Sequence, residues 1–408
     1  MLPLAAALVL QGMTDGVVPS AEPGWPQWRG PGRQAISAEK GLLRAWPPDG
    51  PPLLWKADTL GRGWSSPILA DGRIHISGDV GEECLLQAFD LEGRRLWKTP
   101  NGRSWKGSYP GARAAAAWSG GRLYHMNAHG RVACLEAATG KELWAVNVLE
   151  RFEGKNVTWA TSECLLVEGS RVYVTPGGKK ALMAALDAKT GETVWTSDPL
   201  PGDNTSYCSP LLILRGGRRI LLNCSSRHGF AVDVQTGRIL WTVPMATPYD
   251  VNVSAPAYAD GQVHFATPHA DVGAFRISAD GTKIEPAWTT PLDTCTGGFL
   301  LVDGILYAGG YQKFRHWVGL DWKTGETRHE LRELTTGSAV WADGRLYCMA
   351  EDGRAALVTP AAEGFRIAGE KRLTPRRVKD AWAHPVILDG RLYLRYHDTL
   401  WCFDVRAR

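Results

Sequence analysis

The chain has no long apolar segment and no strong excess of charge. After the first ten residues, no stretch approaches the 18 apolar residues that indicate a membrane-spanning helix. The formal net charge is only +4 over 408 residues, too small to indicate nucleic-acid binding by itself. We therefore expect no transmembrane span and no nucleic-acid partner.

Cysteine spacing also excludes the common metal motifs. The eight cysteines are scattered, without a CxxC pair or a Cys/His set at zinc spacing. Each is expected to be a small buried hydrophobic residue. Cys164 and Cys208 open corresponding strands of successive repeats, and a disulfide between them is an open alternative.

The sequence motifs of several enzyme classes are missing as well. There is no GxSxG, no Walker lysine motif, and no GxGxxG between a strand and a helix. No Ser/His/Asp arrangement is supported either. The chain therefore carries no motif of an α/β-hydrolase, a P-loop enzyme or a Rossmann dehydrogenase.

What the chain has is an internal repeat. The stretch AALDAKTGETVW (184–195) returns in weaker form at 88–97, 135–144, 231–241, 274–288 and 319–329. A second marker, an apolar strand followed by Asp-Gly, Gly-Gly or, once, Gly-Ser and an alternating strand, occurs eight times at intervals of 40 to 49 residues. Four short strands in about 45 residues is the period of a β-propeller blade.

The two ends of the repeat indicate how the ring closes. The last unit ends at TLWCFDVRAR (399–408) and has no room for its Trp-bearing strand, whereas PPLLWKAD (51–58) carries Trp55 without earlier strands of its own. We therefore predict an all-β, eight-bladed β-propeller of four-stranded antiparallel blades, closed by an N-terminal strand that completes the last blade. Closure of this kind removes exposed sheet edges.

The chain divides at this strand. Residues 51–408 are predicted to form a single propeller, residues 22–50 an N-terminal extension, and residues 1–21 a short signal peptide. The apolar start MLPLAAALVL lacks the basic residues of a strong signal. We expect a periplasmic or secreted protein, with a cytoplasmic location as the alternative.

The repeat Ala-x-Asp-x-x-Thr-Gly-x-x-x-Trp resembles that of the pyrroloquinoline-quinone (PQQ)-like β-propellers. The segments WPQWRGPGRQAIS (25–37), WPPDGPPLLW (46–55) and GRGWSSP (61–67) look like an exported bacterial branch of this family. The family is distantly similar to quinoprotein alcohol dehydrogenases and to the propeller lipoprotein of the outer-membrane β-barrel assembly machinery. Its Ala, Gly and Trp serve packing and turns, so the resemblance implies the fold and leaves the function open.

The resemblance implies one alternative activity, a PQQ- and Ca²⁺-dependent oxidoreductase. Quinone enzymes of this type often carry adjacent cysteines, and this chain has none. They also hold Ca²⁺ with a carboxylate–amide–carboxylate set, and Glu163, Asn252 and Asp293 are similar to that set in order and placement. We expect no cofactor, with PQQ and Ca²⁺ as the alternative.

The segments that feed the innermost strands should line one mouth of the axis. Aromatic and arginine side chains on such loops are typical binding anchors. Arg113 is expected to bind an anion or a neighbouring carboxylate such as Glu163. The predicted binding residues are Arg62, Trp64, Tyr109, Arg113, Trp159, Tyr207, Tyr249, Trp382 and His384.

Together these features favour an exported scaffold that binds a protein, peptide or small ligand at its axial face without catalysis. It is expected to be a monomer. The quinoprotein dehydrogenase remains the alternative, and the role of the 25–37 segment stays open.

Overall fold

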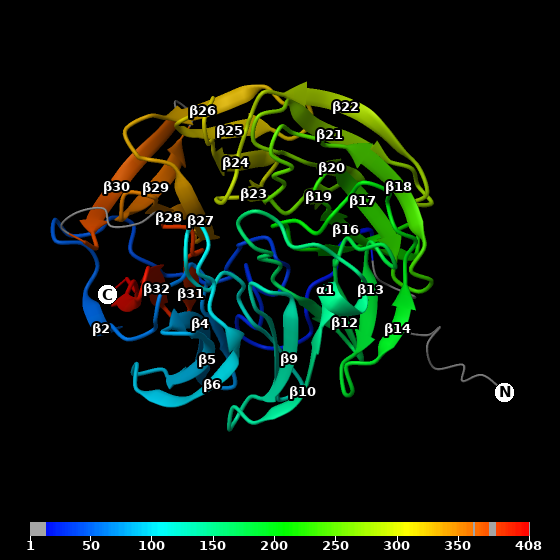
Figure 1. Cartoon of the computed structure of the whole chain (residues 1–408). Helices are drawn as coiled ribbons and strands as arrows, with labels where there is room; N and C mark the ends of the chain where they lie inside the picture. Colours follow the sequence, from blue (N-terminus) through cyan, green and yellow to red (C-terminus); the bar gives the residue numbers. More distant parts are fainter. Residues whose placement is uncertain (1–13, 362–363, 375–380, 408) are drawn as a thin grey trace.

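The computed structural model describes residues 14–361, 364–374 and 381–407, which form a ring of eight antiparallel sheets (Figure 1). The predicted eight-bladed, all-β propeller is confirmed. The described part of the chain contains one helix, α1 (Val148–Arg151). None of its helical segments has the length and apolarity needed to cross a bilayer.

The first four blades follow the chain from the inner strand to the outer strand. Blade 1 is β3 (Ile68–Ala70), β4 (Arg73–Val80), β5 (Glu83–Asp90) and β6 (Arg95–Arg103). Blade 2 is β7 (Ala117–Ser119), β8 (Arg122–Met126), β9 (Arg131–Glu136) and β10 (Glu142–Asn147). Blade 3 is β11 (Leu166–Glu168), β12 (Arg171–Val174), β13 (Ala184–Asp187) and β14 (Thr193–Thr196). Blade 4 is β15 (Leu211–Arg215), β16 (Arg218–Cys224), β17 (His228–Asp233) and β18 (Ile239–Pro244).

The remaining blades keep the same order. Blade 5 is β19 (Ala257–Ala259), β20 (Gln262–His264), β21 (Val272–Ile277) and β22 (Ile284–Thr290). Blade 6 is β23 (Phe299–Val302), β24 (Ile305–Gly309), β25 (Trp317–Asp321) and β26 (Thr327–Leu331). Blade 7 is β27 (Gly337–Ala342), β28 (Arg345–Ala350), β29 (Arg354–Ala361) and β30 (Gly364–Arg372). Blade 8 is β31 (Val386–Leu388), β32 (Arg391–Tyr396), β33 (Thr399–Asp404) and β2 (Leu53–Ala57).

Blade 8 closes the ring as the sequence predicts. Strand β2 pairs antiparallel with β33, with Leu53 opposite Phe403 and Trp55 opposite Cys402. The first and last strands of the propeller therefore belong to one sheet, and separating the ring requires breaking that sheet.

Where an outer strand carries the repeated tryptophan, that residue joins its blade to the next one. The indole N–H of Trp97 in blade 1 donates to the carbonyl of Ala137 in blade 2 at 3.1 Å. Gly140, in the Thr-Gly turn of blade 2, lies against the same indole, and a Cβ there would be 2.5 Å from a ring carbon. The motif recurs because Trp and Gly are complementary halves of the contact between two blades.

The apolar core lies mainly between neighbouring blades. One cluster joins Tyr124 and Val132 of blade 2 to Val172 and Leu186 of blade 3. Each of these side chains is at most 2 % exposed. This arrangement supplies the burial that a single four-stranded sheet cannot achieve alone.

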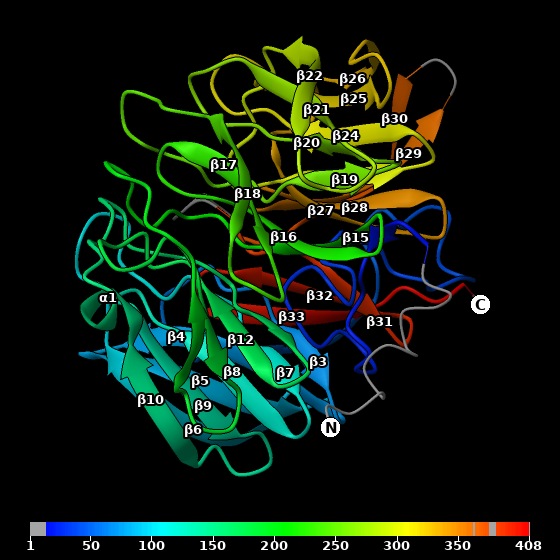
Figure 2. The same cartoon turned by 90° about the vertical axis from the view of Figure 1, so that its right-hand side faces the viewer.

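The N-terminal segment forms an additional layer across one mouth of the ring. We name residues 14–46 the strap. Strand β1 (Gly16–Val17) adds to the inner edge of blade 4, opposite Leu214 and Ile213. Farther along, Trp25 pairs with Leu69 of blade 1 and Ile36 with Trp341 of blade 7. In Figure 2 the blue strap lies on the side of the ring away from α1.

Acidic side chains attach the strap to the tight turns between inner strands. The Glu22 carboxylate accepts hydrogen bonds from Ser119 Oγ and Gly120 N at 2.8 and 2.9 Å. The Glu39 carboxylate accepts from the backbone N–H groups of Asp389 and Gly390. These four hydrogen bonds hold the strap across the mouth where the Asp-Gly and Gly-Gly turns lie.

The strap includes the 25–37 segment and part of the predicted signal segment. The sequence alone left the role of 25–37 open, and the structure places that segment beneath the axis. Of the predicted signal segment 1–21, residues 1–13 lie outside the described residues, whereas Gly16–Val17 are paired in blade 4. The signal peptide stays a prediction.

Candidate functional site

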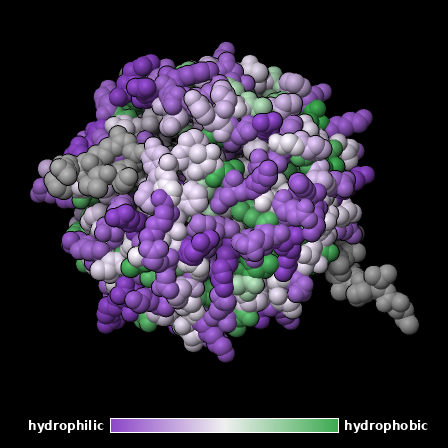
Figure 3. Space-filling view, viewed as in Figure 1, coloured by the Kyte–Doolittle hydropathy of each residue, from purple (hydrophilic) through white to green (hydrophobic). Residues whose placement is uncertain are grey.

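The opposite mouth holds a pocket of about 250 Å³ on the axis of the ring. Figure 3 shows this face, where green and pale residues lie among hydrophilic ones toward the centre. Eight of the nine predicted binding residues line the pocket: Trp64, Tyr109, Arg113, Trp159, Tyr207, Tyr249, Trp382 and His384.

Arg62 is the predicted residue that does not line the pocket. Its backbone forms a two-way bridge with Asp79, at 2.9 and 2.8 Å. Arg62 therefore anchors the loop that leads to Trp64. The binding role of the other eight residues stays a prediction.

Three aromatic rings from three blades form one wall. The Trp64 and Trp382 ring centroids are 4.8 Å apart, and the Tyr109 and Trp382 centroids are 5.1 Å apart. The three loops meet because their inner strands converge on the axis. Such contacts add to the stabilisation from burial and hold a rigid apolar surface at the mouth.

Arg113 was expected to bind an anion or Glu163, but it donates its hydrogen bonds to backbone carbonyls. Its guanidinium donates to the carbonyls of Ser108, Tyr109 and Gly111. It also lies over the rings of Trp64 and Trp105, 5.4 and 5.6 Å from their centroids. Burial lowers the pKa of Arg113 to about 10, with Asp79 acting in the opposite direction. Arg113 thus holds the loop 108–111 and the Trp64 ring in place.

Several pocket residues were missed by sequence reasoning. Tyr311 and His269 line the wall together with Tyr249, and the His269 ring is 5.5 Å from Tyr249 and 6.4 Å from Tyr311. Tyr311 and His269 lie on turns between the second and third strands of their blades, outside the loops in which the sequence predicted binding residues. Trp28 of the strap and Glu351 also line the pocket. No repeat signal marks Trp28, so only long-range structure could reveal it.

The loop that carries Tyr311 is held by Asp293, one of the three predicted calcium ligands. The Asp293 carboxylate accepts hydrogen bonds from the backbone N–H groups of Tyr311, Gln312, Lys313 and Phe314 at 2.7 to 3.3 Å. Burial opposes ionisation, and these four donors outweigh it, so the pKa of Asp293 is lowered. Asp293 therefore organises a rim loop.

Glu163, the second predicted ligand, is buried between blades 3 and 4. Its carboxylate accepts from Thr175 N at 2.8 Å, from Thr175 Oγ1 at 2.7 Å and from Asn223 Nδ2 at 3.3 Å. Burial raises the pKa of Glu163 to about 7, although these hydrogen bonds and nearby Arg33 act in the opposite direction. Both oxygens are engaged inside the sheet.

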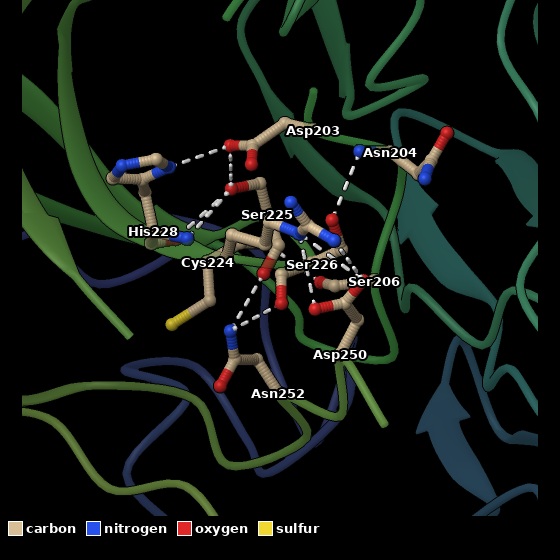
Figure 4. Close-up of polar contacts among 10 residues, drawn as sticks. Asp203, Asn204, Ser206, Cys224, Ser225, Ser226, His228, Asp250 and Asn252 are labelled. Carbon is tan, nitrogen blue, oxygen red and sulfur yellow. Dashed lines mark hydrogen bonds and ion pairs between the residues drawn. The ribbon is translucent and has the colours of Figure 1, made fainter. Parts of the chain in front are cut away.

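Asn252, the third predicted calcium ligand, donates hydrogen bonds to the backbone of blade 4. Its Nδ2 donates to the carbonyls of Ser225 and Ser226 at 2.9 and 3.1 Å, as Figure 4 shows. The three side chains thus serve three separate local tasks. Within the described ranges, no group of three His, Cys, Asp or Glu side chains could hold a metal ion. Asn252 Oδ1, the oxygen that would bind calcium, has no hydrogen-bond partner, so the calcium set implied by the resemblance stays a prediction.

A second polar cluster beside Asn252 contains a serine, a histidine and an aspartate. Asp203 Oδ2 accepts from Ser225 Oγ at 2.5 Å and from His228 Nδ1 at 2.9 Å (Figure 4). The serine hydroxyl therefore bonds to the carboxylate rather than to the imidazole. A nucleophile–base relay needs the serine on the histidine, so this cluster holds the turn of blade 4.

The cysteines are free thiols, so the alternative of a Cys164–Cys208 disulfide is wrong. Cys164 Sγ accepts a hydrogen bond from Ala115 N, and Cys208 Sγ donates to the carbonyl of Ser254. The two thiols thus bond to different neighbouring blades.

Eight repeated blades, several of them joined by Trp–Gly contacts, with an axial pocket over a strap, define a repeat-built β-propeller. A family model described as "Outer membrane protein assembly factor BamB" matches residues 82–329. The match covers more than half of the chain, and the protein belongs to this PQQ-like propeller family.

Two curated relatives illustrate the breadth of the family. The outer membrane protein assembly factor BamB of Yersinia pestis is 25% identical over 276 residues, covering 64% of this chain and 66% of the relative. The quinohemoprotein alcohol dehydrogenase ADH IIB of Pseudomonas putida is 33% identical over 157 residues, covering 34% of this chain and 22% of the relative. The matches thus span about two thirds of the first relative and about a fifth of the second.

Solved structures agree on the fold. BamB from Moraxella catarrhalis superposes with a TM-score of 0.59 at 14% identity, covering 87% of this chain and 98% of that one. The quinohemoprotein alcohol dehydrogenase from Comamonas testosteroni gives 0.66 at 16% identity, covering 95% and 81%. At such identities the likeness extends to the fold alone.

Proposed function

We propose that this protein is an exported, non-catalytic binding scaffold that holds a ligand or a partner's side chain in its axial pocket. The observation that carries the proposal is the pocket wall, where aromatic rings from seven blades surround one space that is open at the mouth. Tyr249 is 63% exposed, Tyr109 42% and Tyr311 40%. Large exposed aromatics around a concavity are typical of binding sites.

The polar groups of the wall support binding rather than bond-making. A catalytic centre needs a nucleophile and a base within hydrogen-bond reach of each other. Here the donors of Arg113 are used by three carbonyls. Ser162 Oγ donates to the Tyr207 carbonyl. These groups shape the wall and hold its loops.

The relatives favour a protein partner or a small ligand without deciding between them. One relative is named an outer membrane protein assembly factor, which favours a protein partner and a location outside the cytoplasm. Others are named alcohol dehydrogenases, which favours a small molecule. A monomer with one axial pocket is compatible with a protein partner and with a small ligand.

The experiment that tests the proposal is photocrosslinking from the rim. A photoreactive phenylalanine analogue replaces Tyr249, and the protein is irradiated with an extract of the source cells. We expect adducts, identified by mass spectrometry, from this position. The matched control replaces Leu143, which is 43% exposed on the outer strand β10.

Variants then place the contact on the pocket. Trp64→Ala, Arg113→Ala and Trp382→Ala should each reduce the adduct yield about tenfold or more, the size of a hot-spot contact. Arg73→Ala and Arg345→Ala, beside the tight turns of the other mouth, should leave it unchanged. Adducts that depend on Arg73 and Arg345 instead would place binding on the wrong face.

A quinone- and Ca²⁺-dependent oxidoreductase is the second candidate, because of the local similarity to quinohemoprotein alcohol dehydrogenases. The calcium ligands are its weak point, since Glu163 and Asp293 bond to their own neighbours. After incubation with PQQ and Ca²⁺, the protein is assayed for dye reduction with alcohols and for bound quinone by absorbance and mass spectrometry. We expect neither. Activity that disappears in Glu163→Gln would establish the oxidoreductase and defeat the binding scaffold.

A further inference from the structure

The floor of the pocket is an indole supplied by the strap. Trp28 lines the pocket and packs below against two apolar clusters, one in blades 1 to 3 and one in blades 4 and 5. It therefore lies near the axis, where the other pocket residues surround it. A ligand that enters the open mouth meets the ring of Trp28.

Two buried arginines hold Trp28 in place. The guanidinium carbons of Arg29 and Arg33 lie 5.3 and 5.5 Å from the Trp28 ring centroid. Arg33 donates to the carbonyls of Cys164 and Leu165 in blade 3, and Arg29 donates to the carbonyl of Phe299 in blade 6. These hydrogen bonds attach the strap to blade 3 and to blade 6, next to the indole.

The strap backbone pays a conformational cost for this placement. Arg29, Arg33 and Ala35 have φ values of 62°, 55° and 57°, a region that side chains other than glycine rarely adopt. Such strain persists only where the surrounding contacts over-determine it. The position of Trp28 is therefore built into the fold.

Next to Trp28 lies a hydrogen-bond acceptor without a donor. The His384 ring is 5.1 Å from the Trp28 ring and is only 4% exposed. Burial and then Arg29 lower the pKa of His384 well below its usual value, so the ring is neutral. The imidazole interacts with the backbone of Thr296, whereas Nδ1 is buried without a hydrogen-bond partner. In a neutral imidazole with one N–H engaged, the other nitrogen accepts.

A hydroxyl group lies at the backbone of the same histidine. Ser66 Oγ accepts a hydrogen bond from His384 N at 2.8 Å, and Ser66 lines the pocket. The hydroxyl hydrogen of Ser66 is donated to no other described residue. One ligand oxygen that accepts from Ser66 and donates to His384 Nδ1 would satisfy both groups, and a hydroxyl is the group that does both.

We propose that the pocket binds a neutral, polyhydroxylated ring with an apolar face, such as a hexose unit of a glycan, stacked on Trp28 with one hydroxyl between Ser66 and His384. This proposal rests on the axial pocket being the binding site. The volume of about 250 Å³ is smaller than that of most drug-sized pockets, which begin near ~300 Å³. It therefore suits a single ring.

The wall chemistry favours a neutral ligand over a charged one. An anion would need donors, and those of Arg113 are used by backbone carbonyls. Glu351 Oε1 already accepts from Trp382 Nε1 at 3.1 Å and from Thr296 Oγ1 at 3.3 Å. Aromatic faces and hydroxyl-sized polar contacts are what a sugar ring requires.

The test is titration of the full chain with a defined panel, followed by isothermal calorimetry and tryptophan fluorescence. The probes are the methyl glycosides of glucose, galactose and mannose, their single-position deoxy analogues, choline, benzoate and inorganic phosphate. We expect at least one glycoside to bind and to change the fluorescence. One of its deoxy analogues should bind at least about tenfold more weakly, because a site built for a hydroxyl rejects the analogue that lacks it.

Variants distinguish the loss of a ligand contact at the pocket floor from a loss of folding. Trp28→Ala and His384→Leu should weaken the glycoside about tenfold or more, whereas His384→Gln, whose amide oxygen can accept, should recover part of the affinity. Trp401→Ala, on β33 and outside the pocket, is the matched control. Thermal melts of each variant show whether it is folded.

The outcomes distinguish this proposal from the proposed function. Glycoside binding that depends on Trp28 and His384 supports it. Binding of choline, benzoate or phosphate in the same Trp28-dependent manner, without glycoside binding, overturns the ligand class while leaving the axial pocket as the site. Crosslinking at Tyr249 with no probe bound also rejects the sugar. Loss of both results would reject the pocket itself.

Discussion

The indole N–H of Trp55 donates a 2.8 Å hydrogen bond to the carbonyl of Leu91. Trp55 is on the N-terminal strand that completes blade 8, and Leu91 lies in a turn of blade 1. Gly93 in the same turn lies against the indole, where a Cβ would be 2.6 Å from a ring carbon. The contact that joins successive blades thus also joins the last blade to the first.

Trp55→Ala should therefore lower the free energy of unfolding by about 2–4 kcal/mol, somewhat below the full cost of truncating a buried Trp, because Trp55 is only half-buried. The measurement is urea denaturation followed by fluorescence. Leu54→Ala, whose side chain is 43% exposed, is the control and should cost less than about 1 kcal/mol. A protein lacking residues 1–58 that melts like wild type would defeat this closure.

The Thr-Gly turns give a second test. Gly140→Ala places a Cβ 2.5 Å from a Trp97 ring carbon at a φ of +74°, so strain and clash should together cost about 2–4 kcal/mol. Gly121→Ala isolates the backbone term, because Gly121 has a φ of +77° and no atom near its Cβ position. It should cost about 1 kcal/mol. Equal losses in the two variants would show that the Trp97 contact is not what requires glycine.

Glu163 should make stability depend on pH. Its pKa is raised from 4.5 to about 7 in the folded protein, so the folded state binds more protons than the unfolded state between these values. This group therefore favours folding at low pH, and its contribution falls by up to about 3 kcal/mol as pH rises from 4.5 to 7. In Glu163→Gln that decline should be absent, so the stability difference between variant and wild type, measured by urea melts, should change as pH rises from 4.5 to 7. A difference that stays constant with pH would contradict the raised pKa.

His264 should act in the opposite direction. Burial lowers its pKa to about 3, and neither ring nitrogen has a hydrogen-bond partner. The unfolded chain takes up a proton below pH 6.5 while the folded chain does not, so stability is lost on acidification. His264→Phe keeps the packing against Trp288 and Phe299. It should gain about 2–3 kcal/mol relative to wild type between pH 6.5 and 4.5.

His329→Phe is the control for this prediction. His329 is only half-buried, and burial lowers its pKa less completely. Its variant should gain less on acidification than His264→Phe. Equal gains at the two positions would mean that burial of the imidazole is not the cause.

The repeat made the architecture readable from sequence because its residues act locally. Asp-Gly turns, alternating strands and the Trp of most outer strands recur every 40 to 49 residues, and each contacts the same element of its own or the next blade. The missing strand after Asp404 and the unpaired strand at Trp55 then specified ring closure. The loops that feed the inner strands likewise had to meet at one mouth, which is why most of the predicted aromatic residues line the pocket.

The other residues of the site make contacts that do not recur from blade to blade. Arg113 and Asp293 read as a cation and an anion on loops, yet their partners are backbone carbonyls and N–H groups whose directions depend on loop conformation. The oxygens of Glu163 and Asp293, two of the three predicted calcium ligands, likewise accept hydrogen bonds from neighbouring strand and loop groups.

The sequence by itself determined the number of blades, the closure and which mouth carries the long aromatic loops, because these follow from spacing and from residue types that act on near neighbours. Only the tertiary structure decided where the strap lies and what forms the pocket floor. Arg29, Arg33 and Trp28 meet blades 3, 6 and 8 from more than a hundred residues away in the chain. Their positions result from burial and hydrogen bonding at the axis, where all eight blades converge.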